Sequence, residues 1–258
     1  MKQLFYILLQ FPLYINTYAQ YVFPPFPRDI SQMQTVDSVK IRVWYAFNAV
    51  DINNQKTFDD LQRLDIGINS SKYFSFFTYC SDSLVTEWKK KNKGAGSAPL
   101  KIGNSGKKTE GWTEYYYVDF FKDFTKGNLT EYAYMPRGIP HCYYTEDLPA
   151  FNWEMSEDTI TIAGYLCQKA TCRFRGRDFT AWFTTEIPIS NGPVKFGGLP
   201  GLILKIYDSE KLFIYECVKI ENLKRVIPLK LYTLKYNAID LEKYRKLLKD
   251  IYILIIIN

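Results

Sequence analysis

Hydrophobic and polar residues alternate with a period of two along much of the chain, a pattern typical of half-buried β-strands. In the segment SVKIRVWYAFNAV, the residues Val39, Val43, Tyr45 and Phe47 fall on one face of a predicted strand and Lys40 on the other. The same pattern predicts further strands at 61–68, 72–79, 112–121, 129–135, 160–174, 178–187, 202–207 and 212–220. Short turns join consecutive strands, so we predict a mainly β protein with an antiparallel meander rather than βαβ units.

Two segments have helical spacing instead. At 81–91 the apolar residues Leu84, Val85 and Trp88 form one stripe, which predicts a short helix. The segment AIDLEKYRKLLKD is amphipathic and predicts a C-terminal helix that covers one face of the sheet. The apolar end at 252–257 is too short to span a membrane. Two interpretations of it remain open, a last buried strand or an irregular terminus.

The first residues have the layout of a secretory signal peptide. Lys2 precedes an apolar run at 4–15, and Ala19 occupies the last position before a predicted cleavage site. We therefore expect a signal peptide at 1–19 and a single β-rich domain at 20–258. Because the apolar run is shorter than a membrane span, the mature chain is expected to be exported without a transmembrane segment. Periplasmic, outer-membrane associated and secreted locations all remain open.

Composition supports this interpretation and removes some partners. Aromatic residues make up 17% of the 258 residues, which favours pleated sheets over helix bundles. The net charge is +6, but the basic residues are scattered apart from Lys89–Lys91, so nucleic acid is not an expected partner. The stretch at 92–111 is rich in Gly, Lys and Ser, which predicts a mobile insertion.

The cysteines do not indicate a metal site. Five cysteines leave at least one thiol without an intramolecular disulfide partner. Cys167 and Cys172 would lie about 16 Å apart on opposite faces of one strand, too far to bond to each other. No CxxC motif occurs and His141 is the only histidine, so we expect neither a metal nor any other cofactor. The cysteines are expected to be simply buried or to form disulfides.

Candidate catalytic groups are few. A Ser–His–Asp or Cys–His site would need His141, but the adjacent Cys142 would point to the opposite face of a strand. Glu154, Glu157 and Asp158 offer the paired carboxylates of a glycosidase, although acidic residues before a strand more often form a solvated turn. No catalytic residue is therefore assigned.

A hairpin and two aromatic residues are the candidates for ligand binding. Arg173, Arg175 and Arg177 alternate through a predicted turn at Gly176. Arginines that share one face can hold a carboxylate or phosphate group, and the alternative is a solvated hairpin tip. Aromatic residues on the mixed face of the neighbouring strands could line an apolar groove. The candidate ligand surface therefore comprises Arg173, Arg175, Trp182 and Tyr207.

Alternation also predicts which side chains of these strands face the core. Phe183 and Leu204 belong to uniformly apolar faces and are expected to be buried. Trp182 and Tyr207, together with Ile203, are expected on the opposite face, which would lie nearer to any binding surface.

In the stretch KFGGLPGLILKIYD at 195–208, glycines and a proline interrupt regular secondary structure, and a strand pattern follows directly. Gly197 and Gly198 permit positive φ or close backbone approach, Pro200 fixes its own φ, and Gly201 frees the chain just before Leu202. A phosphate-binding loop is disfavoured, because no helix follows and no Lys-Ser/Thr pair ends the motif. We predict a crossover that packs tightly against its surroundings.

At this point the chain resembles the GLPGLI family of exported Bacteroidota proteins, which is named for the signature at Gly198–Ile203. The matching residues run in the family's order, and the extended stretch at 71–75 is also similar to the family's early strand. The resemblance implies an open, curved sheet or half-barrel with one or two covering helices, by analogy with periplasmic lipoprotein carriers. It implies no reaction, and the motif residues are interpreted as structural. They are Cys167, Lys169, Gly176, Arg177, Trp182, Gly192, Pro193, Gly198, Leu199, Pro200, Gly201, Leu202 and Ile203. The match also includes Ile187, Pro188, Lys195, Phe196 and Asp208.

Three functions follow as hypotheses. The leading one is a non-catalytic cell-envelope protein whose sheet binds an apolar small molecule or an envelope protein. The second is an accessory component of an outer-membrane receptor or transport system that docks through a sheet edge or aromatic surface. The third is a hydrolase that uses His141.

Overall fold

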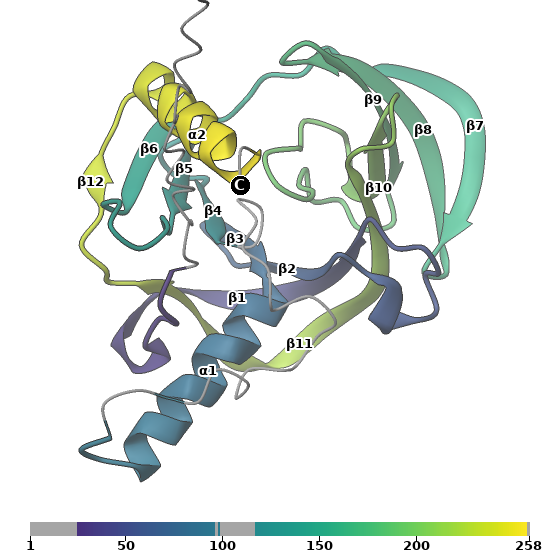
Figure 1. The fold of residues 1–258 in the computed structure, drawn as a ribbon. Coiled ribbons are helices and arrows are strands. Elements are labelled where there is room, and N and C mark those ends of the chain that lie inside the picture. The colour runs from purple at the N-terminus through teal and green to yellow at the C-terminus, as the bar shows by residue number, and fades with distance from the viewer. Residues whose placement is uncertain (1–24, 96–97, 99–116, 257–258) are drawn as a thin grey trace, which may run out of the picture.

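The computed structural model describes residues 25–95, 98 and 117–256, and it contains one large sheet and two α-helices in this part of the chain (Figure 1). The signal peptide predicted at 1–19 and most of the insertion predicted at 92–111 lie outside the described residues. The elements are β1 (Met33–Phe47), β2 (Asp60–Ile66), β3 (Ser70–Ser75), α1 (Phe76–Lys91), β4 (Val118–Asp123), β5 (Asn128–Ala133), β6 (Cys142–Asp147), β7 (Glu154–Ile162), β8 (Tyr165–Phe174), β9 (Arg177–Thr184), β10 (Leu202–Asp208), β11 (Ile214–Tyr232), β12 (Asn237–Ala238) and α2 (Leu241–Ile256).

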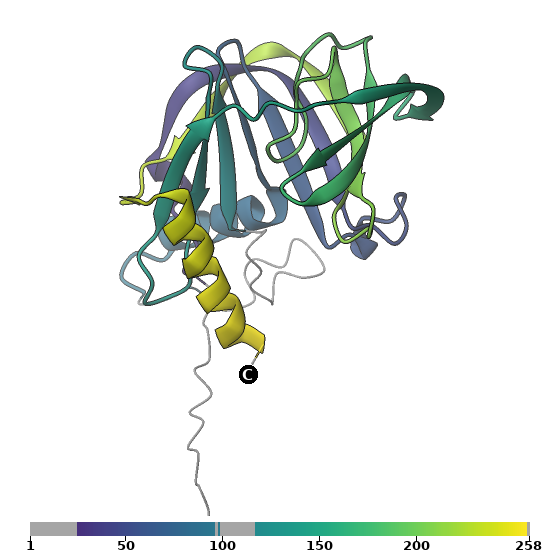
Figure 2. The same cartoon turned by 90° about the horizontal axis from the view of Figure 1, so that it is seen from above.

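The sheet consists of two meanders joined at its centre. Strands β1 to β6 lie side by side in chain order, strands β7 to β11 do the same, and the two runs meet where β1 pairs with β11. The only parallel pairing among the described strands is that of β12 with β6. Figures 1 and 2 show that the sheet curves until its two ends face each other across an opening. The predicted antiparallel meander and open, curved sheet are therefore confirmed.

The inner face of the curve is the main core, and β1 shows why. Val43, Tyr45 and Phe47 point to this face and are at most 4% exposed, as their alternation predicts. The hydroxyl of Tyr45 donates a hydrogen bond to the carbonyl of Ile203 at 2.7 Å, which links β1 to β10 across the interior. The structure thus satisfies the polar end of a buried tyrosine within the core.

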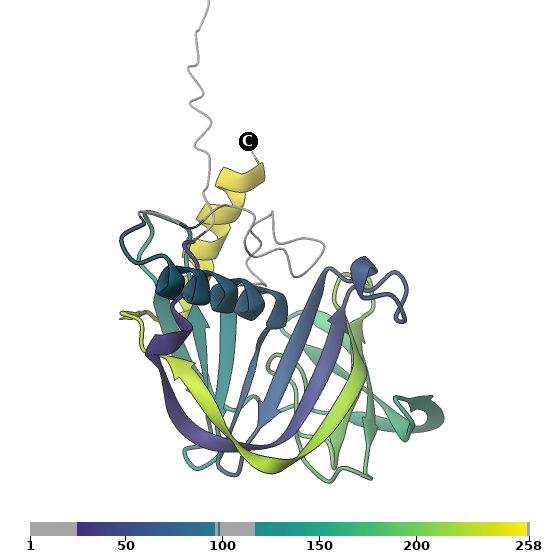
Figure 3. The ribbon, with the colours of Figure 1, turned by 90° about the horizontal axis from the view of Figure 1, so that it is seen from below.

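Helix α1 lies against the outer face of the sheet beside β2 and β3 (Figure 3). It begins at Phe76, because the Ser75 side chain accepts a hydrogen bond from the backbone of Thr78 and so caps the helix. The predicted strand at 72–79 therefore ends at Ser75, and the helix predicted from Ser81 starts five residues earlier, at Phe76. Arg28 fastens the helix by a buried ion pair with Asp82 at 2.8 Å.

The C-terminal segment is also helical. Helix α2 stands at the opening of the sheet near β5 and β6 (Figure 1), and its residues Tyr244 and Ile251 are buried. The predicted C-terminal helix is confirmed, but it extends to Ile256, so the interpretation of the apolar end as a strand is wrong. An unbroken run of residues without Gly or Pro gives the helix no stop signal there. No helix within the described ranges is long and apolar enough to cross a membrane.

Two predictions need correction on the far side of the sheet, one of a strand and one of a turn. The segment at 160–174 is not one strand, because Ala163 and Gly164 take positive φ values and turn the chain between β7 and β8. The acidic stretch at 154–158 is not a solvated turn but the start of β7, the exposed strand at one end of the sheet.

The strands around the motif have a register that simple alternation misses. Phe183 and Leu204 are buried as predicted, at 1% and 0% exposure. Ile203 is also fully buried, so its predicted place on the outer face with Tyr207 is wrong. The reason is an irregularity between Ile203 and Lys205 in the pairing of β10 with β9, which shifts the alternation by one residue. Trp182 pairs with Lys205 and is half-buried.

Candidate functional site

The motif lies inside the curved sheet. Residues 185–201, called the motif loop below, connect β9 to β10 and enter the space between the two ends of the sheet (Figures 1 and 2). Phe196 and Leu199 of this loop are 5% and 2% exposed and belong to the main core. The ring centroid of Phe196 lies 4.8 Å from that of Phe179 on β9 and 5.4 Å from that of Phe151. The predicted tightly packed crossover is therefore a loop that fills part of the interior of the curved sheet.

Two glycines allow the loop to enter. A Cβ atom added at Gly201 would lie 2.0 Å from the backbone oxygen of Thr184, so only glycine permits this approach. Gly198 has a φ of +81°, a conformation that side chains other than glycine rarely adopt. Beside it, the indole of Trp153 donates a hydrogen bond to the carbonyl of Gly197 at 2.8 Å.

The opposite side of the loop is held by a buried lysine. Lys122 on β4 points inward, and its ammonium nitrogen lies 2.8 Å from Asn191 Oδ1 and 2.6 Å from the carbonyl oxygen of Phe196. Asn191 in turn donates a hydrogen bond to Ser71 Oγ on β3 at 3.0 Å. Burial lowers the pKa of Lys122 to about 7. A neutral amine still has two N–H donors, which suffice for both acceptors.

A second polar cluster holds Lys195. Its ammonium nitrogen lies 2.7 Å from Glu131 Oε2 on β5 and 2.9 Å from Glu146 Oε1 on β6. Glu131 also accepts hydrogen bonds of 2.6 Å from the hydroxyls of Tyr144 and Tyr244. Burial raises the pKa of both tyrosines, so they remain hydroxyl donors. Lys195 thus ties the motif loop to β5, β6 and, through Glu131, to helix α2.

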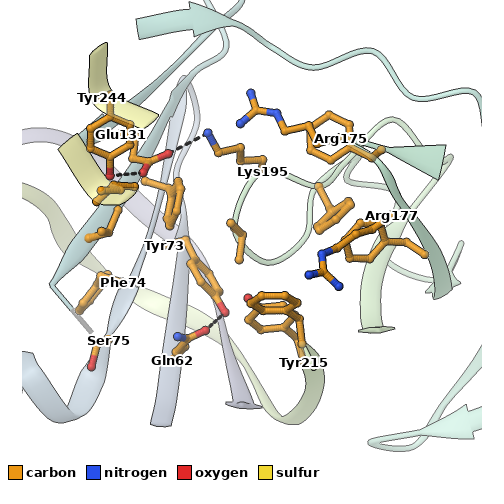
Figure 4. A pocket seen from close by; sticks show the side chains of 18 residues that line it. Gln62, Tyr73, Phe74, Ser75, Glu131, Arg175, Arg177, Lys195, Tyr215 and Tyr244 are labelled. Atoms are coloured by element: carbon orange, nitrogen blue, oxygen red, sulfur yellow. Dashed lines mark hydrogen bonds and ion pairs between the residues drawn. The ribbon is translucent and has the colours of Figure 1, made fainter. Parts of the chain in front are cut away.

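A cavity of about 390 Å³ remains between the motif loop, the β3–β5 strands and helix α2 (Figure 4). This volume is in the range of small-molecule sites. Most of its lining is aromatic or aliphatic. The lining residues are Gln62, Tyr73, Phe74, Ser75, Val118, Phe120, Glu131, Phe174, Arg175, Arg177, Phe179, Val194, Lys195, Phe196, Phe213, Tyr215, Tyr244 and Leu248.

The charged residues of the lining are three basic and one acidic, namely Lys195, Arg175, Arg177 and Glu131. Figure 4 shows the guanidinium groups of Arg175 and Arg177 directed toward the cavity. Arg175 forms an ion pair with Glu146 at 2.5 Å, and Arg177 pairs with the buried Asp208 at 2.9 Å. Each pair engages one guanidinium nitrogen, so further N–H donors remain for a ligand.

The structure separates the four residues of the candidate ligand surface. Arg175 lines the cavity, whereas Arg173 pairs with the exposed Asp178 at 3.1 Å and is absent from the lining. Trp182 and Tyr207 are half-buried and do not line the cavity either. Of the residues interpreted as structural, Arg177 lines the cavity.

The remaining motif residues have structural places. Lys169 pairs with Asp158 of the neighbouring strand at 2.8 Å, and Gly176 takes a φ of +86° in the turn between β8 and β9. A Cβ atom at Gly192 would lie 2.9 Å from Cβ of Ile203. The buried residues of the family match are Cys167, Ile187, Gly192, Pro193, Lys195, Phe196, Leu199, Gly201, Leu202, Ile203 and Asp208.

Sequence reasoning missed Lys122, Glu131, Tyr144 and Tyr244. A signal for Lys122 was present, because Val118 and Phe120 precede it at spacings of two and all three fall on one face of the strand. Glu131 follows the buried Leu129 in the same way. An ionisable residue in the inward register of a strand is therefore a useful indicator of a buried polar site.

The groups considered for catalysis lie apart from one another. His141 packs on Tyr134 with ring centroids 4.1 Å apart, and its Nδ1 accepts a hydrogen bond from the backbone of Met135 at 3.1 Å. No described serine, cysteine or carboxylate side chain bonds to its ring. Burial lowers its pKa. Glu154 and Glu157 are exposed on β7.

All five cysteines lie in described parts of the chain, and none of them forms a disulfide. Four are buried, namely Cys142, Cys167, Cys172 and Cys217, and burial raises the pKa of their thiols. Within the described residues no group of three or more His, Cys, Asp or Glu side chains could hold a metal ion.

The protein therefore belongs to the class of mainly β proteins with one open, curved sheet. The motif loop occupies part of the space inside the sheet, and the cavity lies beside the loop. A family model described as a protein of unknown function (Porph_ging) matches residues 174–205, which include the end of β8, all of β9 and the motif loop. No curated protein matches the chain.

Solved structures of PNGF-II share the fold. In its P21 and C2 crystal forms the TM-scores are 0.53 and 0.51, with 13% sequence identity and 81% of this chain covered. The chain spans 32% of the length of that protein. At this identity the similarity concerns the fold of the sheet alone.

Proposed function

We propose that this chain is an exported, non-catalytic binding protein of the GLPGLI family at the cell envelope, and that its interior cavity takes an amphipathic acid. The acid would place an apolar chain among the aromatic rings and an anionic group against Arg175 and Arg177. The observation that carries the proposal is the cavity itself, about 390 Å³ of mostly apolar space inside a sheet that a loop and a helix already fill.

Packing supports a ligand that is apolar over most of its length. The space is a pocket that is partly open to solvent rather than a sealed void, so a ligand can enter it, and its volume is in the range of small-molecule sites. Rings such as Phe120, Phe179 and Tyr215 line it and would gain contacts with an alkyl or aryl group. An accessible, mostly apolar pocket of this kind favours a binding role over a structural one.

Charge supports an anionic head group. Every basic residue of the lining is already paired: Lys195 with Glu131 and Glu146, Arg175 with Glu146, and Arg177 with Asp208 and Glu210. An anionic group would therefore be held by the guanidinium N–H donors that these pairs leave open, while Glu131 is already saturated by Lys195, Tyr144 and Tyr244. Guanidinium groups present planar pairs of N–H donors that suit carboxylates and phosphates. A cationic ligand would find no free acid among these contacts.

The signal-peptide layout at 1–19 and the family signature at Gly198–Ile203 support the exported location. An interior cavity with aromatic walls suits a carrier or sensor of molecules that dissolve poorly in water. These features do not call for a reaction, since His141 has no catalytic partner among the described residues.

The test is a titration calorimetry comparison of decanoate and 1-decanol on purified, delipidated protein. We expect decanoate to bind with micromolar affinity and decanol more weakly. Arg175→Gln should weaken decanoate binding by about tenfold and leave decanol unchanged. Arg173→Gln is the matched control, because Arg173 belongs to the same hairpin but does not line the cavity, and it should change neither affinity.

A second variant tests the cavity rather than the charge. Val118→Phe adds volume on the β4 side of the lining and should reduce the affinity for both ligands. Equal binding by the parent protein and Val118→Phe, or failure of decanoate to bind the parent protein, would contradict the proposal.

A further inference from the structure

A second concave surface lies on the outer face of the sheet, opposite the interior cavity. It is formed by the outward residues of β4, β5 and β6 together with the segment at 232–236, which leads from β11 to β12. The groove has a volume of about 400 Å³. We call it the outer groove. It shares no lining residue with the interior cavity.

Three tyrosines form the floor of the outer groove. The ring centroid of Tyr132 on β5 lies 5.8 Å from that of Tyr143 on β6 and 5.2 Å from that of Tyr236. Tyr132 and Tyr143 are direct cross-strand partners, so the sheet fixes their spacing. All three are half-buried, which leaves part of each ring exposed to the groove. The groove therefore presents a platform of three mutually tilted aromatic rings within a lining that is more polar than apolar overall.

Polar groups flank this platform at regular positions of the same strands. Next to the tyrosine pair, the hydroxyls of Thr130 and Thr145 lie 2.9 Å apart as the following cross-strand pair. Asn128 lies two residues before Thr130 on β5, so its side chain is on the same face. The side-chain amide of Asn128 and the hydroxyls of Tyr132 and Tyr143 form no hydrogen bond with the described part of the chain.

The electrostatic balance of the groove is neutral. Asp123 and Lys126 are the charged residues of its lining, and they form an ion pair with each other at 3.4 Å. Asp123 also accepts hydrogen bonds from Thr125 and Lys126 in the turn between β4 and β5. The charges therefore stabilise the turn and leave no net field for an ionic ligand.

We infer that the outer groove is a binding site for neutral carbohydrate. A sugar ring has an apolar face of C–H groups and a periphery of hydroxyls that both donate and accept. The tyrosine rings match the apolar face, and the amide of Asn128 and the hydroxyls of Tyr132 and Tyr143 can each donate and accept. This site is separate from the interior cavity, and the inference does not depend on what that cavity binds.

Other occupants fit the outer groove less well. A nucleic acid needs an excess of basic groups along its phosphates, and here Asp123 cancels Lys126. A peptide that extends the sheet needs a free strand edge, but β5 is paired on both sides, with β4 and β6. An apolar ligand would bury the unpaired amide of Asn128 and so lose its hydrogen bonds to water.

The experiment measures binding of three neutral trisaccharides, maltotriose, cellotriose and triacetylchitotriose, by saturation-transfer NMR and titration at millimolar concentrations. We expect at least one of them to bind. Tyr143→Ala should weaken that binding by about tenfold, and Tyr143→Phe, which keeps the ring, should weaken it by about threefold or less. Asn128→Ala should also weaken it.

The control is Tyr207→Ala, which removes a half-buried tyrosine that lines neither the groove nor the cavity and should leave binding unchanged. Melting temperatures of all variants show whether each one is folded. Binding of none of the three sugars would overturn the inference, as would equal binding by the parent protein and Tyr143→Ala. Preferential binding of tri-galacturonic acid, an acidic trisaccharide, would overturn the assignment to neutral carbohydrate.

Discussion

The two ends of the curved sheet face the same interior, yet their inner surfaces differ in chemistry. On the β8–β10 side, here called the apolar wall, the inward residues in the middle of the strands are Ala170, Ala181, Phe183 and Ile206, all at most 1% exposed, and the ion pair of Arg177 with Asp208 lies at the strand ends. On the β3–β5 side, here called the polar wall, Ser71, Lys122 and Glu131 are buried on the inner face. One interior is therefore bounded by two unlike surfaces.

The motif loop matches this difference residue by residue. Its apolar residues Phe196 and Leu199 join the main core, and Phe196 contacts Phe179 on the apolar wall. Its polar residues Asn191 and Lys195 bond to Lys122 and Glu131 of the polar wall. The loop acts as a bracket between the walls, and the unfilled space beside it is the interior cavity.

The comparison explains why the polar wall contains charges at all. A loop with only apolar contacts would fill the space equally well, but it could pack in many positions. A buried ion pair or hydrogen bond has one good geometry and so selects one position of the loop. Lys122 of the polar wall donates to the carbonyl oxygen of Phe196 in the loop, and Lys195 of the loop pairs with Glu131 of the polar wall. We therefore expect the apolar wall to contribute mainly stability and the polar wall mainly the position of the loop.

The largest expected effect is on the apolar side of the bracket. Gly201→Ala would place a Cβ atom 2.0 Å from the backbone oxygen of Thr184, and backbone cannot move aside cheaply. We expect the free energy of unfolding to fall by about 3 kcal/mol or more. Gly197→Ala is the matched control in the same loop, since its nearest atom lies at 3.4 Å, an ordinary contact. Urea unfolding of both variants measures the difference, and similar losses would refute the close-approach explanation.

The next effect concerns the charge pair of the polar wall. Glu131→Gln removes the carboxylate that meets Lys195 at 2.7 Å, although Glu146 still meets the same ammonium group. We expect a loss of about 2 kcal/mol, below that of an isolated buried pair. Glu157→Gln on exposed β7 should change stability by less than about 0.5 kcal/mol. If both variants melted alike, the polar wall would have no special role.

The smallest effect is a pH dependence that belongs to Lys122. Burial lowers its pKa from the ordinary 10.5 to about 7 in the folded state. Between these values the unfolded chain binds more protons than the folded one, so Lys122 makes stability rise with pH. We compare the free energy of unfolding of the parent protein with that of Lys122→Met. The difference should grow in favour of the parent by about 1 kcal/mol between about pH 7 and about pH 8 and should be nearly constant at lower pH. A stability difference that does not change with pH would show that the pKa of Lys122 is not lowered in the folded protein.

The apolar wall could be predicted from sequence far better than the polar wall. Alternation identified Phe183 and Leu204 as buried, and the glycines of the motif indicated tight packing. It failed at Ile203, because an irregular pairing between two chain-adjacent strands leaves no local signal. The start of α1 at Phe76 was missed although Ser75 is a good capping residue, since the strand before it runs directly into the cap.

The polar wall depends on contacts between residues far apart in the chain. Glu131 meets Lys195 and Tyr244, and Lys122 meets Asn191, across separations that no local pattern records. The pairing of β1 with β11, which brings the two walls into one sheet, is equally distant. Sequence identified the arginine hairpin as a ligand candidate, but only the fold shows that Arg175 and Arg177 line the cavity and Arg173 does not.

The most direct test of the bracket is a double-mutant cycle between Glu131→Gln and Lys195→Met, measured by urea unfolding. The account predicts a coupling free energy of about 1 kcal/mol or more, because the two groups lie 2.7 Å apart and join the loop to the polar wall. The control cycle pairs Glu131→Gln with Lys169→Met, whose partner is Asp158, and should show coupling within about 0.3 kcal/mol of zero. Additive effects in the Glu131–Lys195 cycle would contradict the claim that the motif loop is held across the interior by this contact.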